Sequence, residues 1–138
     1  MDDTALELMF NKPAEKTRVK TEALTLGSLV GTWVNVNAAT RDIVKIVLTN
    51  SGGSLNVHGF GACSPTPCDW GQVRGQAYAG SAAGGAAVAF TANYMFGFKT
   101  TILSGHLNGV YLVVDDFNVF SDGSGRSPYF TEGTFRRA

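Results

Sequence analysis

The stretch FKTTILSGHLNGVYLVVDDFNVF, residues 98–120, contains two apolar runs separated by Asn108 and Gly109. Asn-Gly between apolar runs is the strongest short-range signal for a β-hairpin, because both central residues of a type I′ turn need positive φ. The pattern therefore predicts a strand over 98–107, a type I′ turn centred on Asn108 and Gly109, and a second strand over 110–120.

The same alternation of strand-like runs and turns extends outward from this hairpin over residues 31–137. Short runs of apolar and β-branched residues are separated by segments rich in Gly, Asn, Ser and Pro. The connections are too short for the crossovers that parallel strands require, so sequence neighbours should pair as antiparallel strands. The six further predicted strands cover residues 31–38, 42–49, 55–62, 69–80, 86–96 and 129–137.

Eight such strands predict an all-β domain, and the architecture that we expect is an eight-stranded antiparallel up-and-down barrel. Closure of the barrel removes the exposed edges that an open sheet would leave. The alternative is a two-sheet β-sandwich with a Greek-key connection. The length of 138 residues fits one domain. We assign residues 30–138 to the barrel and the more charged residues 1–29 to a short N-terminal arm, in which residues 4–10 favour a helical turn.

Composition limits the classes of partner. Eleven basic residues balance eleven acidic ones, and a net charge of zero argues against binding to nucleic acid or to anionic lipid. No apolar stretch is long enough for a membrane span, and the first residues contain no apolar signal-peptide core. We therefore expect no membrane span, and a cytoplasmic location unless a signal peptide has been removed.

Cys63 and Cys68 enclose a loop that contains two prolines and is followed directly by Asp69 and Trp70. The pair can close a disulfide if its Cα atoms lie within about 7 Å, whereas a reducing cytosol would keep both as thiols. Both states remain open at this point. A structural zinc site needs a second close pair of ligands, which the sequence lacks, so we predict no metal and no cofactor.

Two resemblances follow from these motifs. LVGTW, residues 29–33, resembles the start of the calycins (lipocalins and avidins), in which a Gly-x-Trp motif matches Gly31 and Trp33. It implies that Trp33 packs at the closed end of a barrel under an arginine of the last strand, here Arg136 or Arg137. The chain also resembles a group of small uncharacterised bacterial proteins with the patterns GTWVN…TR, CxPxxCDWG and GRSxY, which implies a common fold.

Candidate functional residues are polar or aromatic groups that the predicted strands place near the barrel interior. Asp115 and Asp116 alternate in one strand, so one of them must point inward, where a carboxylate needs a partner such as Arg74 or Lys99. A histidine can titrate near neutral pH, and His58 lies either on the surface or in the cavity. The predicted ligand-binding residues are His58, Asp69, Trp70, Arg74, Tyr94 and Asp116.

Three functions fit this pattern. The first is binding of a partly apolar small-molecule ligand in the barrel mouth. The second is assembly as a homo-oligomer through the glycine- and alanine-rich strands over 69–80 and 86–96. The third is a cofactor-independent enzyme of the isomerase or cyclase type, in which His58 or Asp116 acts as acid and base; other catalytic residues are not assigned.

Overall fold

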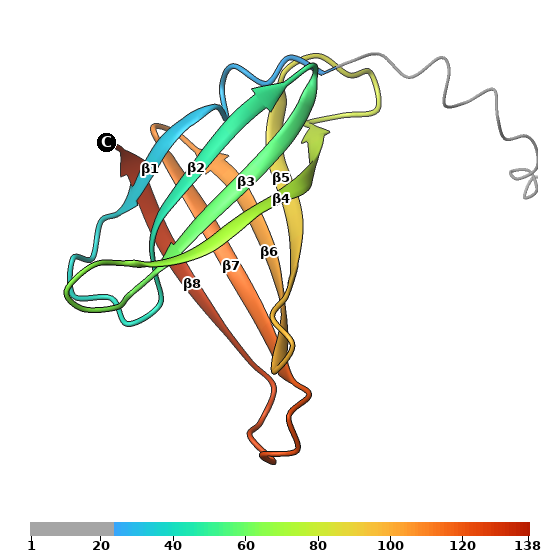
Figure 1. The fold of residues 1–138 in the computed structure, drawn as a ribbon. Coiled ribbons are helices and arrows are strands. Elements are labelled where there is room, and N and C mark those ends of the chain that lie inside the picture. Colours follow the sequence, from blue (N-terminus) through green and yellow to red (C-terminus); the bar gives the residue numbers. More distant parts are fainter. Residues whose placement is uncertain (1–23) are drawn as a thin grey trace, which may run out of the picture.

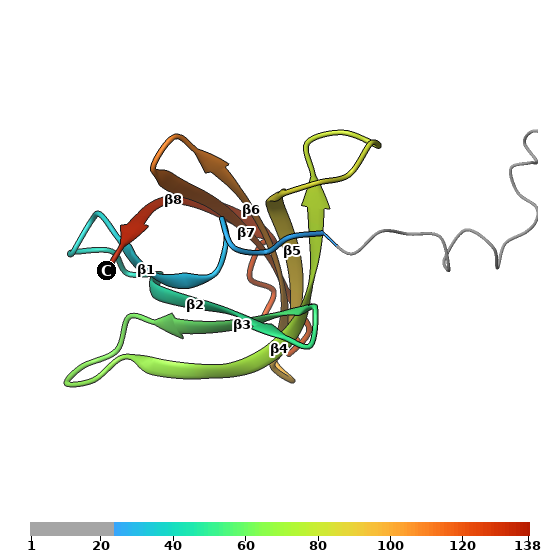
Figure 2. The same ribbon diagram turned by 90° about the horizontal axis from the view of Figure 1, so that it is seen from above.

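The computed structural model describes residues 24–138, which form a closed barrel of eight antiparallel strands (Figure 1). Each strand pairs with its sequence neighbours, and the first pairs with the last, so that the strands follow one another around a ring (Figure 2). This confirms the predicted up-and-down barrel and excludes the two-sheet sandwich. The strands are β1 (Gly31–Asn35), β2 (Ile43–Ser51), β3 (Ser54–Gly61), β4 (Cys68–Ala79), β5 (Ala87–Met95), β6 (Lys99–Asn108), β7 (Tyr111–Phe120) and β8 (Tyr129–Arg137).

The β6–β7 hairpin is present, but its turn lies one residue later than predicted. Asn108 pairs with Tyr111, so Gly109 and Val110 are the central residues of the turn. Gly109 has a φ of 63°, the conformation that primed turns need at their first central position. The Asn-Gly signal therefore located the hairpin correctly and placed its turn centre one residue too early.

One end of the barrel, called here the plugged end, is closed by residues 24–30. Leu26 and Leu29 of this segment are buried in the core, and Trp33 donates a hydrogen bond from Nε1 to the Leu29 carbonyl at 2.8 Å. Arg137 lies over the Trp33 ring, with its Cζ 4.3 Å from the ring centre. The contact that the calycin resemblance implies is thus present, and Arg137 rather than Arg136 makes it.

The part of the expected N-terminal arm that the structure describes belongs to the barrel. The backbone of Thr25 bonds to Gly85 and Ala87 beside the start of β5, and Leu29 is completely buried. Residues 24–29, which the sequence analysis assigned to the arm, thus pack against the barrel. The predicted helical turn over residues 4–10 lies outside the described residues.

The core occupies the plugged half of the barrel. Inward residues alternate with outward ones along each strand, as Leu55 and Val57 do in β3. Gly105 of β6 has no side chain because Phe90 of β5 fills that space: a Cβ on Gly105 would lie 2.4 Å from the Phe90 ring. This close packing fills the barrel interior beside Gly105.

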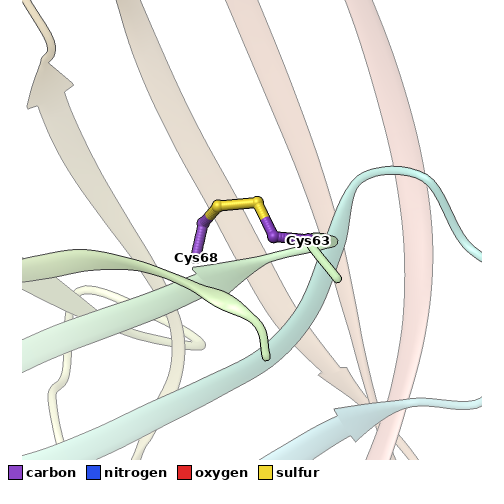
Figure 3. The surroundings of a disulfide bond; sticks show 2 residues. All are labelled: Cys63 and Cys68. Atoms are coloured by element: carbon purple, nitrogen blue, oxygen red, sulfur yellow. A yellow bond between two sulfur atoms is a disulfide. The ribbon is translucent and has the colours of Figure 1, made fainter. Parts of the chain in front are cut away.

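The opposite end, called here the loop end, is formed by connections 36–42, 62–67, 96–98 and 121–128 (Figure 1). Cys63 and Cys68 form a disulfide across the second of these connections, with their Cα atoms 5.3 Å apart (Figure 3). Of the two states that the sequence left open, the structure contains the disulfide. The bond links Cys63, just after the end of β3, to Cys68, the first residue of β4, and so closes the loop covalently.

Candidate functional site

A cavity of about 380 Å³ opens between connection 36–42 and the first half of β8. It exists because β1 pairs with β8 only through Trp33, Val34 and Asn35, so that residues 129–134 of β8 have no ladder partner in β1. Connection 36–42 crosses this gap instead of a strand. The cavity walls come from β1, the 36–42 connection, the start of β2, β7 and β8, and we call it the side cavity.

Two carboxyl groups and one hydroxyl meet in the side cavity. Asp116 points inward from β7 and is only 2% exposed, while Asp42 approaches from the end of the 36–42 connection. Thr131, the β8 residue paired with Asp116, lies between them. Its Oγ1 is 2.6 Å from Oδ2 of Asp42 and 3.0 Å from Oδ2 of Asp116.

A chain of hydrogen bonds between buried side chains reaches Asp116 on the side away from Thr131. Asn118 donates from Nδ2 to Oδ1 of Asp116 at 2.7 Å, and Thr101 donates from Oγ1 to Oδ1 of Asn118 at 2.7 Å. Asn118 and Thr101 are themselves buried. Because buried polar groups are costly unless hydrogen-bonded, this chain both stabilises Asp116 and fixes the direction of its second oxygen toward the cavity.

Burial is the largest cause of the raised pKa of Asp116. Burial and, after it, the hydrogen bond and negative charge of Asp42 raise the pKa of Asp116 to about 7. The hydrogen bonds from Asn118 and Thr131 act in the opposite direction. Two carboxylates in contact cannot both ionise cheaply, so Asp116 keeps its proton up to near neutral pH beside Asp42.

The prediction that one residue of the Asp115–Asp116 pair points inward is confirmed, but its predicted partners are wrong. Arg74 points outward from β4, on the opposite side of the strand from Gly75, whose α-carbon faces Leu55 and Val57 in the core. The ammonium of Lys99 lies about 6 Å from the rings of four aromatic residues at the loop end: Trp70, Phe96, Phe98 and Phe120. A second carboxyl group, not a cation, therefore faces Asp116.

His58 and Asp69 lie together on the outer wall, away from the side cavity. The His58 Nε2 is 2.5 Å from Oδ1 of Asp69, and its ring stacks on Phe60 with centroids 4.5 Å apart. A hydrogen bond from the Gly71 backbone, and next the bond to His58, lower the pKa of Asp69. The chain has only two histidines, and His106 is also on the outer wall, so neither supplies an acid–base group to the cavity.

Trp70 and Tyr94 pack inside the barrel near the loop end. Their rings meet edge to face with centroids 5.4 Å apart. The Tyr94 hydroxyl accepts a hydrogen bond from Gly59 N at 3.0 Å and donates to Gly71 O at 2.7 Å. The Tyr94 hydroxyl therefore both accepts from and donates to backbone groups of the protein. Of the six predicted ligand-binding residues, Asp116 is the one that lines the side cavity.

Four residues of the site were not predicted from the sequence: Asp42, Thr131, Asn118 and Thr101. The alternation of β7 contains a signal for part of this set, because its inward series changes from Leu112 and Val114 to polar residues toward the loop end. The neighbouring strands place threonines at the corresponding inward positions. Asp42 gives no such signal, since it lies in an irregular connection.

The fold and the site together are a small closed antiparallel barrel with two facing carboxyl groups in a side cavity. Comparison with protein-family profiles, with curated proteins and with solved structures found no match. Within residues 24–138, no three His, Cys, Asp or Glu side chains form a group suited to a metal ion. The same residues include no helix with the length and apolarity needed to cross a bilayer.

Proposed function

We propose that the protein binds a small, partly apolar molecule in the side cavity. The observation that carries this proposal is Asp116, a 2% exposed carboxyl group that lines a cavity open to solvent. Burial of a carboxyl group is costly, and perturbed carboxyl groups in clefts are concentrated at functional sites. The volume of about 380 Å³ is in the lower part of the range for small-molecule sites.

The lining suits a ligand with one polar and one apolar part. Ile43, Val114 and Phe135 supply apolar walls, while Asp42 and Asp116 lie at one position of the cavity. Such a mixture of an apolar surface and a few convergent polar groups is typical of ligand sites. The proposed position is therefore lateral, between the 36–42 connection and β8, and not the aromatic-filled loop end.

Native mass spectrometry of protein purified from its own source tests this proposal. We expect a small additional mass on the folded protein, which is lost on denaturation. The ligand released in this way is then returned to the protein and followed by amide NMR shifts, which should be largest for Asn35, Thr131 and Gly133. Failure of the released compound, and of a small-molecule fragment set, to shift these amides would overturn the proposal.

A blocked cavity provides the matched variant. Gly133→Val places a branched side chain at an inward position of β8 that lines the cavity, whereas Thr134→Val changes the adjacent residue on the outer wall. We expect Gly133→Val to weaken ligand binding at least tenfold and Thr134→Val to leave it unchanged. A Cβ at residue 133 comes within 3.1 Å of Asn35 and Phe135, so a thermal melt must show that the variant folds.

The pKa of Asp116 favours one second candidate, a cofactor-independent acid–base enzyme in the same cavity. A general acid or base is most effective when its pKa is near the working pH, and the value of about 7 meets that condition. Chemical conversion of the bound compound, lost in Asp116→Asn while binding of the unreacted compound persists, would favour this candidate over plain binding.

A further inference from the structure

We propose that the ligand of the side cavity carries a basic nitrogen, and that its cationic group takes the place of the proton shared by Asp42 and Asp116. This inference rests on the proposed ligand-binding function and adds the chemical class of the ligand. It comes from the number of hydrogens, the charges and the geometry around the two carboxyl groups.

The protein offers a single hydroxyl hydrogen to the two facing carboxyl oxygens of Asp42 and Asp116. The Thr131 hydroxyl has one proton and lies within 3.0 Å of one oxygen on each carboxyl group. Asn118 donates only to the other oxygen of Asp116. When both carboxyl groups are ionised, one of the two facing Oδ2 atoms therefore receives no hydrogen from the protein, although Asp116 is almost completely buried and directed into the cavity.

No protein cation neutralises the pair within the described residues. The two ion pairs found there join His58 to Asp69 and Arg126 to Asp122, and neither includes Asp42 or Asp116. Arg41 lines the cavity but makes no ion pair with either carboxyl group. A proton or an external cation must therefore compensate Asp42 and Asp116.

The other groups facing the pair also favour a cation. β8 contributes Tyr129 and Glu132 to the lining, and the 36–42 connection contributes Arg41 as the one basic side chain. Burial, followed by the charges of Asp42 and Asp116, raises the pKa of Tyr129, so its phenol stays neutral and offers an aromatic face to a cation. An anionic ligand would instead meet the two facing carboxyl groups of Asp42 and Asp116.

A cationic ligand should release the shared proton when it binds. Near pH 6 the pair holds this proton, and the ligand cation displaces it, so binding and protonation compete. Near pH 8 the proton is largely gone already, and binding releases little. Affinity should therefore rise about tenfold or more between pH 5.5 and pH 7.5, which is opposite to what a neutral ligand that accepts a hydrogen bond from the protonated pair would show.

Benzylamine and benzyl alcohol serve as probes, because they share one ring and differ in the charge of one group. We expect benzylamine at pH 7.5 to bind at least tenfold more tightly than benzyl alcohol, with NMR shifts centred on Asn35, Thr131 and Gly133. Calorimetry at pH 6 in two buffers with different ionisation enthalpies should detect proton release for benzylamine alone. Asp42→Asn and Asp116→Asn should each remove the preference, while Asp115→Asn on the outer wall should retain it.

The outcomes separate the two proposals. If benzyl alcohol shifts the cavity amides as strongly as benzylamine, or if benzylamine affinity falls as the pH rises, the inference of a cationic ligand is overturned and ligand binding still stands. If neither probe nor any compound of a charge-varied fragment set shifts these amides, the ligand-binding proposal fails as well.

Discussion

Asp116 is a carboxyl group whose neutral form fits its surroundings better than its charged form. Its folded-state pKa of about 7 lies well above the value near 4 of an unfolded chain. Between these two values the unfolded chain has released the proton and the folded chain has not. Stability contributed by protonated Asp116 is therefore complete below about pH 4 and is lost as the pH rises toward 7.

The substitution Asp116→Asn tests this residue directly. Asparagine resembles the protonated acid, so we expect the variant to be within about 1 kcal/mol of the natural protein at pH 4. At pH 8 it should be more stable, by up to about 4 kcal/mol, because three pKa units correspond to about that free energy. Urea unfolding at pH 4, 6 and 8 measures the difference.

Asp115→Asn is the matched control for that experiment. Asp115 is adjacent in β7 but points to the outer wall, where it contacts Glu132 and raises the pKa of that residue. The control should still lose stability between pH 4 and pH 7. An Asp116→Asn variant that declines over the same interval as the natural protein would show that another group is responsible.

At the scale of elements, the closure between β1 and β8 is the shortest pairing of the barrel. Three residue pairs join these strands, whereas β6 and β7 are joined by ten. Arg137 reinforces the short closure by donating from its two terminal nitrogens to the carbonyls of Val30 and Ser28, each at 2.7 Å. It also covers Trp33. These contacts join β8 to residues 24–30, the plug segment that closes the plugged end.

Arg137→Lys should weaken this closure although the charge is kept. Lysine cannot supply a planar fork to two carbonyls and stack on an indole at the same time. We expect the free energy of unfolding to fall by about 1–2 kcal/mol, the contribution of hydrogen bonds from a charged group at a partly exposed site. Arg136→Lys is the control, since Arg136 bonds only to the neighbouring Arg137 carbonyl, and it should change stability by less than about 0.5 kcal/mol.

For the molecule as a whole, the core and the disulfide are separate sources of stability. The core residues lie between the plug segment and the middle of the barrel, while the Cys63–Cys68 loop is exposed. The barrel should therefore fold without the disulfide. The disulfide closes a loop of only a few residues, for which chain entropy predicts about 2 kcal/mol.

Replacement of both cysteines by serine tests this separation. We expect the double variant to keep the far-ultraviolet circular dichroism of the barrel and to unfold with about 2 kcal/mol less free energy. Reduction of the natural protein with dithiothreitol should have the same effect. Loss of the native spectrum in both cases would mean that the loop contributes to the core.

The outer wall bears on the assembly hypothesis. The small residues of β4 that suggested a flat contact face, such as Gly75 and Ala77, are half-buried, and Arg74 and Gln76 project outward. Exposed apolar side chains gather instead on β6, β7 and β8, where Ile102, Phe117 and Phe130 are cross-strand neighbours. The oligomeric state remains a prediction.

How much the sequence predicts differs between the fold and the site. All eight strands lie close to their predicted ranges, because alternation and turn residues are local signals. Among the site residues, Asp116 was found from this same alternation. Its expected partner was wrong, because Asp42 is 74 residues away in sequence and reaches Asp116 only after β1 and β8 close the barrel.

Sequence alone therefore determined the strands, their antiparallel order, the inward direction of one aspartate and the neighbourhood of the two cysteines. All of these depend on residues that are adjacent or a few positions apart. Only the tertiary structure decided that His58 faces outward, that Tyr94 is used by the backbone and that Asp42 faces Asp116. These facts depend on β-bulges, on the short β1–β8 pairing and on an irregular connection, which together set the distance between groups far apart in the chain.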